Sequence, residues 1–219
     1  MSARKTLKAT PQRLRESIAV IIDGKDEKWY IEQLREFYSK EKITKIKISP
    51  EFPEKKSVHD LFEMAERLAG QSYSHIFLII DLDNILKDAV ETRKFQEKYK
   101  VYNTKNKGRK NKWMEKLTII INSPCLEYWY LLHFKQTNRF YPDYDALKPD
   151  LRKSNPILKQ YDKSETFYYQ SPGLFRKLEP YIEVAKANAL PFDILSMHQK
   201  GFSEMFKLFD YLTITKSTP

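Results

Sequence analysis

Cysteine, glycine and long apolar runs are scarce or missing in this sequence of 219 residues, and two of these absences exclude whole classes of protein. A single cysteine cannot form an internal disulfide framework, and it rules out a zinc site built from cysteines. No run of about 18 apolar residues is present, so the sequence predicts no transmembrane helix. The features of a secretory signal peptide are also missing. We therefore expect a soluble, cytoplasmic protein that has no membrane partner.

Positive charge is in excess. The 39 lysines and arginines outnumber the 29 acids, which gives a formal net charge of +10 at pH 7. Such a balance favours polyanionic partners, nucleic acid first. Apolar residues make up 41% of the chain and aromatic residues 14%, which is enough for a core and argues against global disorder. The length fits one large domain, or one domain with an extension.

Several short apolar runs, most of them followed by signals for a helix, set the expected architecture. Residues 17–23, 76–80 and 117–122 are rich in β-branched side chains, as buried parallel strands are. We predict an α/β fold with a mainly parallel, Rossmann-like sheet and helices on both faces. Residues 43–49 should form an edge strand that Pro50 ends. Strands that end at Asp23, Asp81 and Asn122 should be neighbours.

The chain should divide into three parts. Residues 1–16 are a basic arm, either a frayed terminus or a phosphate-binding segment. Residues 17–140 form the α/β core, with a basic insertion at 85–116. Residues 141–219 form a mostly helical C-terminal part packed on the core, with a helix over 173–189 that is kinked or divided at Pro180 and a last helix over 202–212.

Asp81 and Asp83 come directly after the apolar run of residues 76–80. Side chains two apart in a strand point the same way, so both carboxylates should project together at the carboxyl end of the strand. Ligands bind at that edge of open α/β sheets. Two carboxylates held close repel each other unless a cation such as Mg²⁺ or Mn²⁺ neutralises them. Alternatively, the two acids merely end the strand and cap the next helix.

Other acids also follow strands. Asp23 ends the first run, and the turn after it carries Lys25, then Asp26 as the expected N-cap, and then Glu27. Lys25 is either a phosphate ligand or a solvated turn lysine. Glu127 should lie in the first turn of a helix that starts at Pro124, with Ser123 as its cap, where it either complements the helix dipole or joins the acids.

The remaining histidines and the cysteine favour structural roles. His133 lies within an apolar run, where a buried core histidine is the default over a catalytic one. Cys125 lacks the histidine and acid pattern of a nucleophile, so we expect it to be buried. His59 and His75 stand alone and predict no metal site.

A basic segment with interleaved aromatic residues covers residues 98–116. Positive charge combined with stacking rings is typical of proteins that bind single-stranded nucleic acid, although a solvated loop has the same composition. The aromatic residues are Tyr99, Tyr102 and Trp113. The candidate nucleic-acid-binding residues are Lys105, Lys107, Arg109, Lys110 and Lys112.

Three motifs together resemble the RloB family of bacterial proteins, which is associated with restriction and phage defence. They are DGKDE after the first strand, DLD at residues 81–83, and NSPCLEYWYLLHF from residue 122. The resemblance implies a Toprim-like fold and a Mg²⁺- or Mn²⁺-dependent nuclease, with abortive infection as its role. It also implies an ATPase encoded nearby as a possible partner.

Carried over by position, the resemblance assigns roles to individual residues. It implies catalytic roles for Asp23, Glu27, Lys25 and Lys163. It implies metal binding by Asp81, Asp83 and Glu127. The sequence departs from the family at Asp23, where the family has a glutamate that is one methylene longer.

Two other functions remain open at this point. The first is a non-catalytic Toprim-like module that binds nucleic acid or protein, and the shorter acid at position 23 slightly favours it. The second is a metal-dependent phosphotransferase that acts on nucleotides, but the sequence has no glycine-rich loop of the P-loop type.

Overall fold

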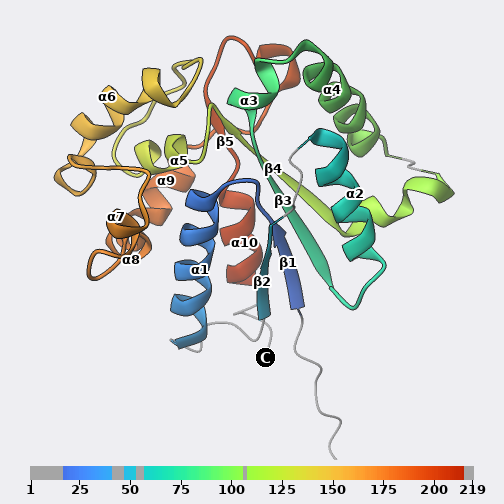
Figure 1. The fold of residues 1–219 in the computed structure, drawn as a ribbon, viewed down its shortest axis with the longest axis horizontal. Coiled ribbons are helices and arrows are strands. Elements are labelled where there is room, and N and C mark those ends of the chain that lie inside the picture. The colour runs from blue at the N-terminus through green and yellow to red at the C-terminus, as the bar shows by residue number, and fades with distance from the viewer. Residues whose placement is uncertain (1–16, 41–46, 53–56, 106–107, 215–219) are drawn as a thin grey trace, which may run out of the picture.

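The computed structural model describes residues 17–40, 47–52, 57–105 and 108–214. Within these residues, the strands form one sheet in the order β2-β1-β3-β4-β5 (Figure 1). The first four pair in parallel, and β5 is antiparallel to β4. The strands are β1 (Ser17–Ile21), β2 (Lys47–Glu51), β3 (His75–Asp81), β4 (Leu117–Ser123) and β5 (Phe202–Ser203).

Helices cover both faces of this sheet, which confirms the predicted α/β architecture (Figure 1). One face carries α2 (Val58–Ala69), α4 (Ala89–Asn103) and the 3-10 helix η1 (Arg109–Lys116). The other face carries α1 (Lys25–Lys40), α5 (Glu127–Leu132), α6 (Tyr144–Ser154), α7 (Glu165–Tyr169), α8 (Leu174–Leu178), α9 (Ile182–Asn188) and α10 (Phe206–Ile214). The short helix α3 (Leu82–Leu86) follows β3 directly, and η2 (Pro156–Leu158), η3 (Glu179–Tyr181) and η4 (Ile194–Ser196) lie in connections.

The central strands are apolar throughout because both of their faces are buried. In β3, Phe77 and Ile79 belong to the core beneath α1, whereas Ile76, Leu78 and Ile80 belong to the core beneath α2 and α4. Successive side chains of a strand point to opposite faces, so a strand between two helical layers needs an apolar residue at every position.

The register brings the carboxyl ends of the central strands together. Ile21 of β1 is paired with Leu78 of β3, and Asp81 at the end of β3 is paired with Asn122 of β4. The strands that lead to Asp23, Asp81 and Asn122 are therefore neighbours, as predicted. The edge where they end lies beside α3 (Figure 1).

Three predicted boundaries at this edge and at β2 were wrong. Pro50 lies inside β2, paired with Val20, and the strand accepts it because β2 is at the edge of the described sheet. Helix α1 begins at Lys25, so Asp26 lies in its first turn and is not the N-cap. Helix α5 begins at Glu127 with Leu126 as N-cap, and the Ser123–Pro124 peptide is cis, so Pro124 is not the first helical residue.

The C-terminal part differs from its prediction in one further element. Phe202 and Ser203 form β5, and the last helix begins only at Phe206. The predicted break at Pro180 is confirmed, because η3 separates α8 from α9 there. Residues 1–16, the predicted basic arm, lie outside the described residues.

Candidate active site

Asp81 is the central acid at the carboxyl edge of the sheet. Its side chain is only 6% exposed and accepts two hydrogen bonds. The Asn122 amide donates to Oδ1 over 3.1 Å, and the Leu126 backbone N–H donates to Oδ2 over 3.1 Å. Asp81 ends the strand and occupies the N-cap position of α3, as the alternative interpretation required, but its side chain makes no capping hydrogen bond. Its orientation comes instead from β4 and the segment before α5.

Glu27 lies beside Asp81 and is also buried, with 3% of its surface exposed. Burial raises the pKa of Glu27 well above its ordinary value, and the negative charge of Asp81 raises it further. Burial likewise raises the pKa of Asp81, followed by the charge of Asp23. Glu27 Oε2 is buried and has no hydrogen-bond partner among the described residues. In the absence of a cation, burial and mutual repulsion therefore favour the protonated form of these acids.

Gly24 makes this position of Glu27 possible. A Cβ atom built on Gly24 would lie 1.8 Å from Glu27 Oε2, far inside van der Waals contact. Glycine therefore lets the carboxylate fold back beneath the turn that joins β1 to α1. Asp23 precedes it and is partly buried, close enough for its charge to raise the pKa of both Glu27 and Asp81.

A second acid group centres on Glu127, which is fully buried in the first turn of α5. Its Oε1 accepts a hydrogen bond from the Tyr161 hydroxyl at 2.6 Å and lies 2.9 Å from Lys163 Nζ. Lys163 Nζ also lies 2.8 Å from Asp26 Oδ2. Burial alone would lower the pKa of Lys163, but the neighbouring carboxylates outweigh burial and raise it, so the ammonium stays charged.

The geometry fits a hard divalent cation that keeps much of its own water. Within residues 17–40, 47–52, 57–105 and 108–214, no three acids, histidines or cysteines converge into a preformed metal shell. Mg²⁺ needs only one or two carboxylates together with water, however. Glu27 and Asp81 offer a buried pair that repels itself when both groups are ionised, and Glu27 contributes an unpartnered oxygen. Asp23 acts on this pair through its charge, which raises the pKa of both Glu27 and Asp81.

A comparison with known protein families identifies the family of the chain. The model for the RloB-like protein family matches residues 18–212, which is most of the chain. The chain belongs to the RloB family. No curated protein and no solved structure matches it significantly. Among the helices that the structure describes, none has the length and apolar character to cross a membrane.

Asp83, the second acid of the RloB-type D-x-D motif, does not share a strand face with Asp81. Strand β3 ends at Asp81, and α3 places Asp83 in its first turn, with the Asp83 N–H bonded to the Pro124 carbonyl at 3.0 Å. The predicted same-face geometry was therefore wrong, because alternation stops where the helix begins. Burial raises the pKa of Asp83, and Lys87 is the main charge that opposes the shift. A role for Asp83 in metal binding stays a prediction.

The aromatic residues of the basic segment are largely used by the core. Tyr99 is 8% exposed and packs against Phe95 and Phe192, while Tyr102 and Trp113 lie partly buried on the same core. The expectation that Tyr99 is a stacking platform was therefore wrong. Of the five candidate nucleic-acid-binding residues, Lys107 lies outside the described residues, and the other four have exposed side chains. The exposed ones are Lys105, Arg109, Lys110 and Lys112.

The other candidate residues have structural surroundings. Cys125 is buried as predicted, and Lys25 is exposed on the turn. His133 is buried as predicted, with Nδ1 2.8 Å from the Trp129 carbonyl oxygen, and burial lowers its pKa to about 4, so it is neutral at pH 7. His75 Nε2 lies 2.8 Å from Thr118 Oγ1.

The sequence did not indicate two partners of the acids, Asn122 and Tyr161. Asn122 could have been inferred from its place at the end of a strand beside Asp81. Tyr161 lies two residues before Lys163, but its bond to Glu127 spans 34 positions of the chain, and no local pattern encodes such a contact.

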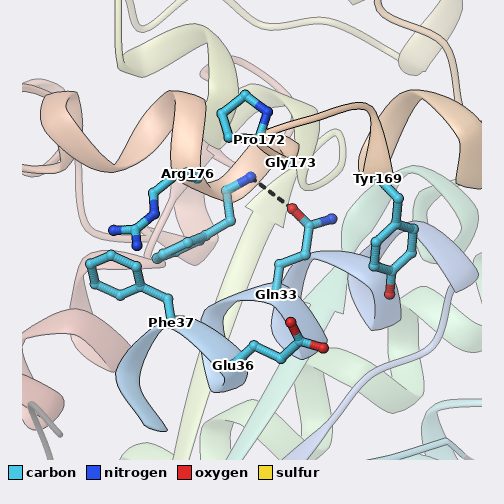
Figure 2. A pocket seen from close by; sticks show the side chains of 8 residues that line it. Gln33, Glu36, Phe37, Tyr169, Pro172, Gly173 and Arg176 are labelled. Atoms are coloured by element: carbon cyan, nitrogen blue, oxygen red, sulfur yellow. Dashed lines mark hydrogen bonds between the residues drawn. The ribbon is translucent and has the colours of Figure 1, made fainter. Parts of the chain in front are cut away.

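A shallow groove behind this site lies between α1 and the loop that leads to α8 (Figure 2). Gln33 crosses it, accepting the Phe175 N–H at 3.1 Å and donating to the Tyr168 carbonyl at 3.0 Å. Both the oxygen and the nitrogen of the Gln33 side-chain amide are therefore hydrogen-bonded. Gln33 thereby holds the end of α7, which carries Tyr168, and the Tyr168 hydroxyl lies 2.9 Å from that of Tyr161.

Proposed function

We propose that this RloB-family protein is a metal-dependent nuclease that hydrolyses phosphodiester bonds in nucleic acid. The observation that carries the proposal is the buried pair of Glu27 and Asp81 at the carboxyl edge of the sheet, with pKa values raised in the absence of a cation. Buried, mutually repelling carboxylates destabilise a metal-free protein, and a cation reverses this effect.

Glu27 and Asp81 would hold Mg²⁺ or Mn²⁺, with Asp23 reaching it directly or through a water. The bound ion would polarise a phosphoryl oxygen and stabilise the charge that develops on it. Asn122 and the Leu126 N–H keep the Asp81 carboxylate in one orientation. Asp23, the most accessible of the three acids, is placed to accept a proton from an attacking water.

The exposed basic residues at the end of α4 and in η1 support nucleic acid as the substrate, together with the net charge of +10. Phosphate contacts supply most of the sequence-independent affinity for nucleic acid. We place this activity in the cytoplasm, in phage defence by abortive infection, and an ATPase encoded nearby would be a natural partner. These assignments follow from the family resemblance.

Metal-dependent cleavage of RNA and of single- and double-stranded DNA tests the proposal, with Asp81→Asn as the blank. Asp23→Ala should remove most of the activity. Asp23→Glu should raise the rate, because the longer side chain reaches the ion without a bridging water. If wild type and Asp23→Glu both match the blank on every substrate, with Mg²⁺ and with Mn²⁺, the nuclease proposal fails.

A non-catalytic module that binds nucleic acid is the second candidate. The observation in its favour is that the described residues hold no preformed shell of three ligands. The same experiment separates the two functions, because a binding module retains affinity for the substrates and cleaves none of them.

A further inference from the structure

Glu127 contacts a lysine and a tyrosine through Oε1, and its other oxygen, Oε2, is buried with no hydrogen-bond partner among the described residues. Its Oε1 lies 2.9 Å from Lys163 Nζ and 2.6 Å from the Tyr161 hydroxyl, and the side chain is fully buried. A cation at Oε1 would have to displace the ammonium group, and a cation at Oε2 would bind a carboxylate whose charge the Lys163 ammonium already neutralises at 2.9 Å. Glu127 is therefore better suited to hold Lys163 than to hold a metal.

Lys163 is held from two sides and still reaches solvent. Its Nζ contacts Glu127 Oε1 and Asp26 Oδ2, and the ring centroid of Tyr144 lies 4.5 Å away. An ammonium group has three N–H donors, and the two carboxylates account for two of them. The side chain is 35% exposed, so an anion from solvent can reach the third donor.

Tyrosine hydroxyls behind Glu127 form a chain that fixes the carboxylate. Tyr161 donates to Glu127, the Tyr168 hydroxyl lies 2.9 Å from that of Tyr161, and the Tyr130 hydroxyl lies 3.2 Å from that of Tyr168. All three rings are fully buried. The chain ends on a carboxylate, which only accepts hydrogen bonds when ionised, so the donor direction runs toward Glu127.

We propose that Glu127 is a positioning residue that anchors Lys163, and that Lys163 binds a non-bridging phosphate oxygen of the nucleic-acid backbone. Tyr161 is a second positioning residue that acts through Glu127. The inference rests on the proposed function only in taking nucleic acid as the ligand. It removes Glu127 from the metal shell and assigns to Lys163 a contact that needs no metal.

Calorimetric titration with Mn²⁺ separates an anchor from a metal ligand. Glu127→Gln should change the Mn²⁺ affinity by less than about threefold, whereas Asp81→Asn should lower it at least about tenfold. Equal losses in the two variants would overturn the anchor role. Because this readout needs no cleavage, it stands whether or not the protein proves to be a nuclease.

Thermal unfolding tests the pair without any ligand. Lys163→Met leaves Glu127 buried without its counter-charge and should lower Tm by roughly 5 °C or more. Adding Glu127→Gln to that variant should restore most of the loss. Lys94→Met is the matched control, because Lys94 pairs with Glu91 over 2.8 Å nearer the surface. A double variant no more stable than Lys163→Met alone would contradict the proposed pairing.

Binding of labelled single-stranded DNA and RNA in EDTA tests the phosphate contact. Lys163→Met should weaken binding and reduce the slope of log K against log salt by about 0.7. Glu127→Ala and the milder Tyr161→Phe should each weaken binding at least about threefold. For Glu127→Ala this is opposite in sign to the simple effect of removing a negative charge.

Tyr128→Phe is the matched control for the loss of a buried hydroxyl, because Tyr128 donates to the Thr137 carbonyl at 2.9 Å and does not take part in the Glu127 chain. It should bind like wild type. Unchanged affinity and slope in Lys163→Met would overturn the phosphate contact even if metal-dependent cleavage is observed. A reduced slope without cleavage would leave this inference standing and remove the nuclease.

Discussion

Glu27 makes the metal-free fold less stable at neutral pH, because its carboxyl group is buried beside Asp81. Its pKa is raised in the folded state, so folding favours the protonated form. Such a group contributes stability that is fully present below its unfolded pKa and is lost as the pH rises through the folded pKa. The apo protein should therefore lose stability between mildly acidic and neutral pH at this position.

Glu27→Gln should raise the free energy of unfolding of the apo protein at pH 7 by about 1–3 kcal/mol. The neutral amide can donate a hydrogen bond to Asp81 and carries no charge to repel it. The gain should shrink as the pH falls toward 4, where wild-type Glu27 is protonated in both states. Urea unfolding in EDTA at several pH values measures this.

Glu66→Gln is a suitable control for that series, since Glu66 is exposed on α2. Its effect should be small and should not vary with pH in the same way. A destabilised Glu27→Gln protein at pH 7 would mean that the buried carboxylate makes a favourable contact in the folded state.

Individual acids were predictable from the sequence where they end a strand. Asp23, Glu27 and Asp81 do lie together, because neighbouring parallel strands end at one edge of the sheet. Asp83 was placed wrongly, because nothing local announces that β3 turns into a helix at once. The Lys163–Glu127 contact joins distant segments of the chain and was not predicted.

Helix α4 turns its aromatic side inward and its charged side outward. Phe95 and Tyr99 belong to the core, whereas Lys94 and Lys100 face solvent. The proposed binding of nucleic acid by this segment would therefore depend on charge and not on stacking on Tyr99. The dependence of binding on salt should therefore reflect phosphate contacts of the exposed basic side chains.

Replacing Lys105, Lys107, Arg109 and Lys110 with serine should flatten the dependence of single-strand binding on salt. Each lost phosphate contact removes about 0.7 from the slope of log K against log salt. Fluorescence anisotropy between low and moderate salt measures the slope. Replacing four exposed basic residues elsewhere, Arg67, Lys153, Lys159 and Lys200, with serine controls for the change in net charge alone. If both sets of changes have the same effect, the segment makes no specific contact with the backbone.

Elements were predictable in proportion to their length and apolar pattern. The strands of seven residues, β3 and β4, were found because both of their faces are buried. Strand β5 has only two residues, and its partner β4 lies far earlier in the chain. Two residues are too few to show the alternating pattern of a strand, so the sequence did not predict β5. Helix α10 was therefore predicted to start too early.

The C-terminal segment is tied into the sheet of the α/β core. Glu204 is buried between β4 and the segment before η4, and its carboxylate accepts N–H groups of Ile121 at 3.3 Å and Phe192 at 3.0 Å. Lys207 Nζ lies 2.8 Å from the same carboxylate. Leu208 and Phe209 of α10 share one core with Ile18 of β1. Residues 141–214 therefore complete a face of the sheet.

Calorimetry should show one cooperative unfolding transition for the whole chain. A chain truncated after residue 140 would expose the apolar face that α10 covers, and it should not give a soluble folded protein. Limited proteolysis offers an independent measurement, because no stable fragment should end near residue 140. Two separate transitions, or a stable fragment of residues 17–140, would show that the chain has two independent folding units.

At the scale of the molecule, the layered α/β arrangement was predictable from the sequence. The way in which the helices after residue 140 cover one face of the sheet was not. Alternating strand and helix signals dictate parallel strands with helices on both sides. The helices after residue 140 are short and interrupted by prolines, so their positions depend on tertiary contacts.

The close approach of Gly24 to Glu27 has a consequence for comparing natural sequences. A side chain at position 24 would displace the Glu27 carboxylate from its present position, since the added Cβ would lie 1.8 Å from the carboxylate oxygen. The two positions should therefore vary together during evolution. In RloB-family members that replace this glycine, the acid in the first turn of the helix should also be replaced, or its carboxylate should lie in another position.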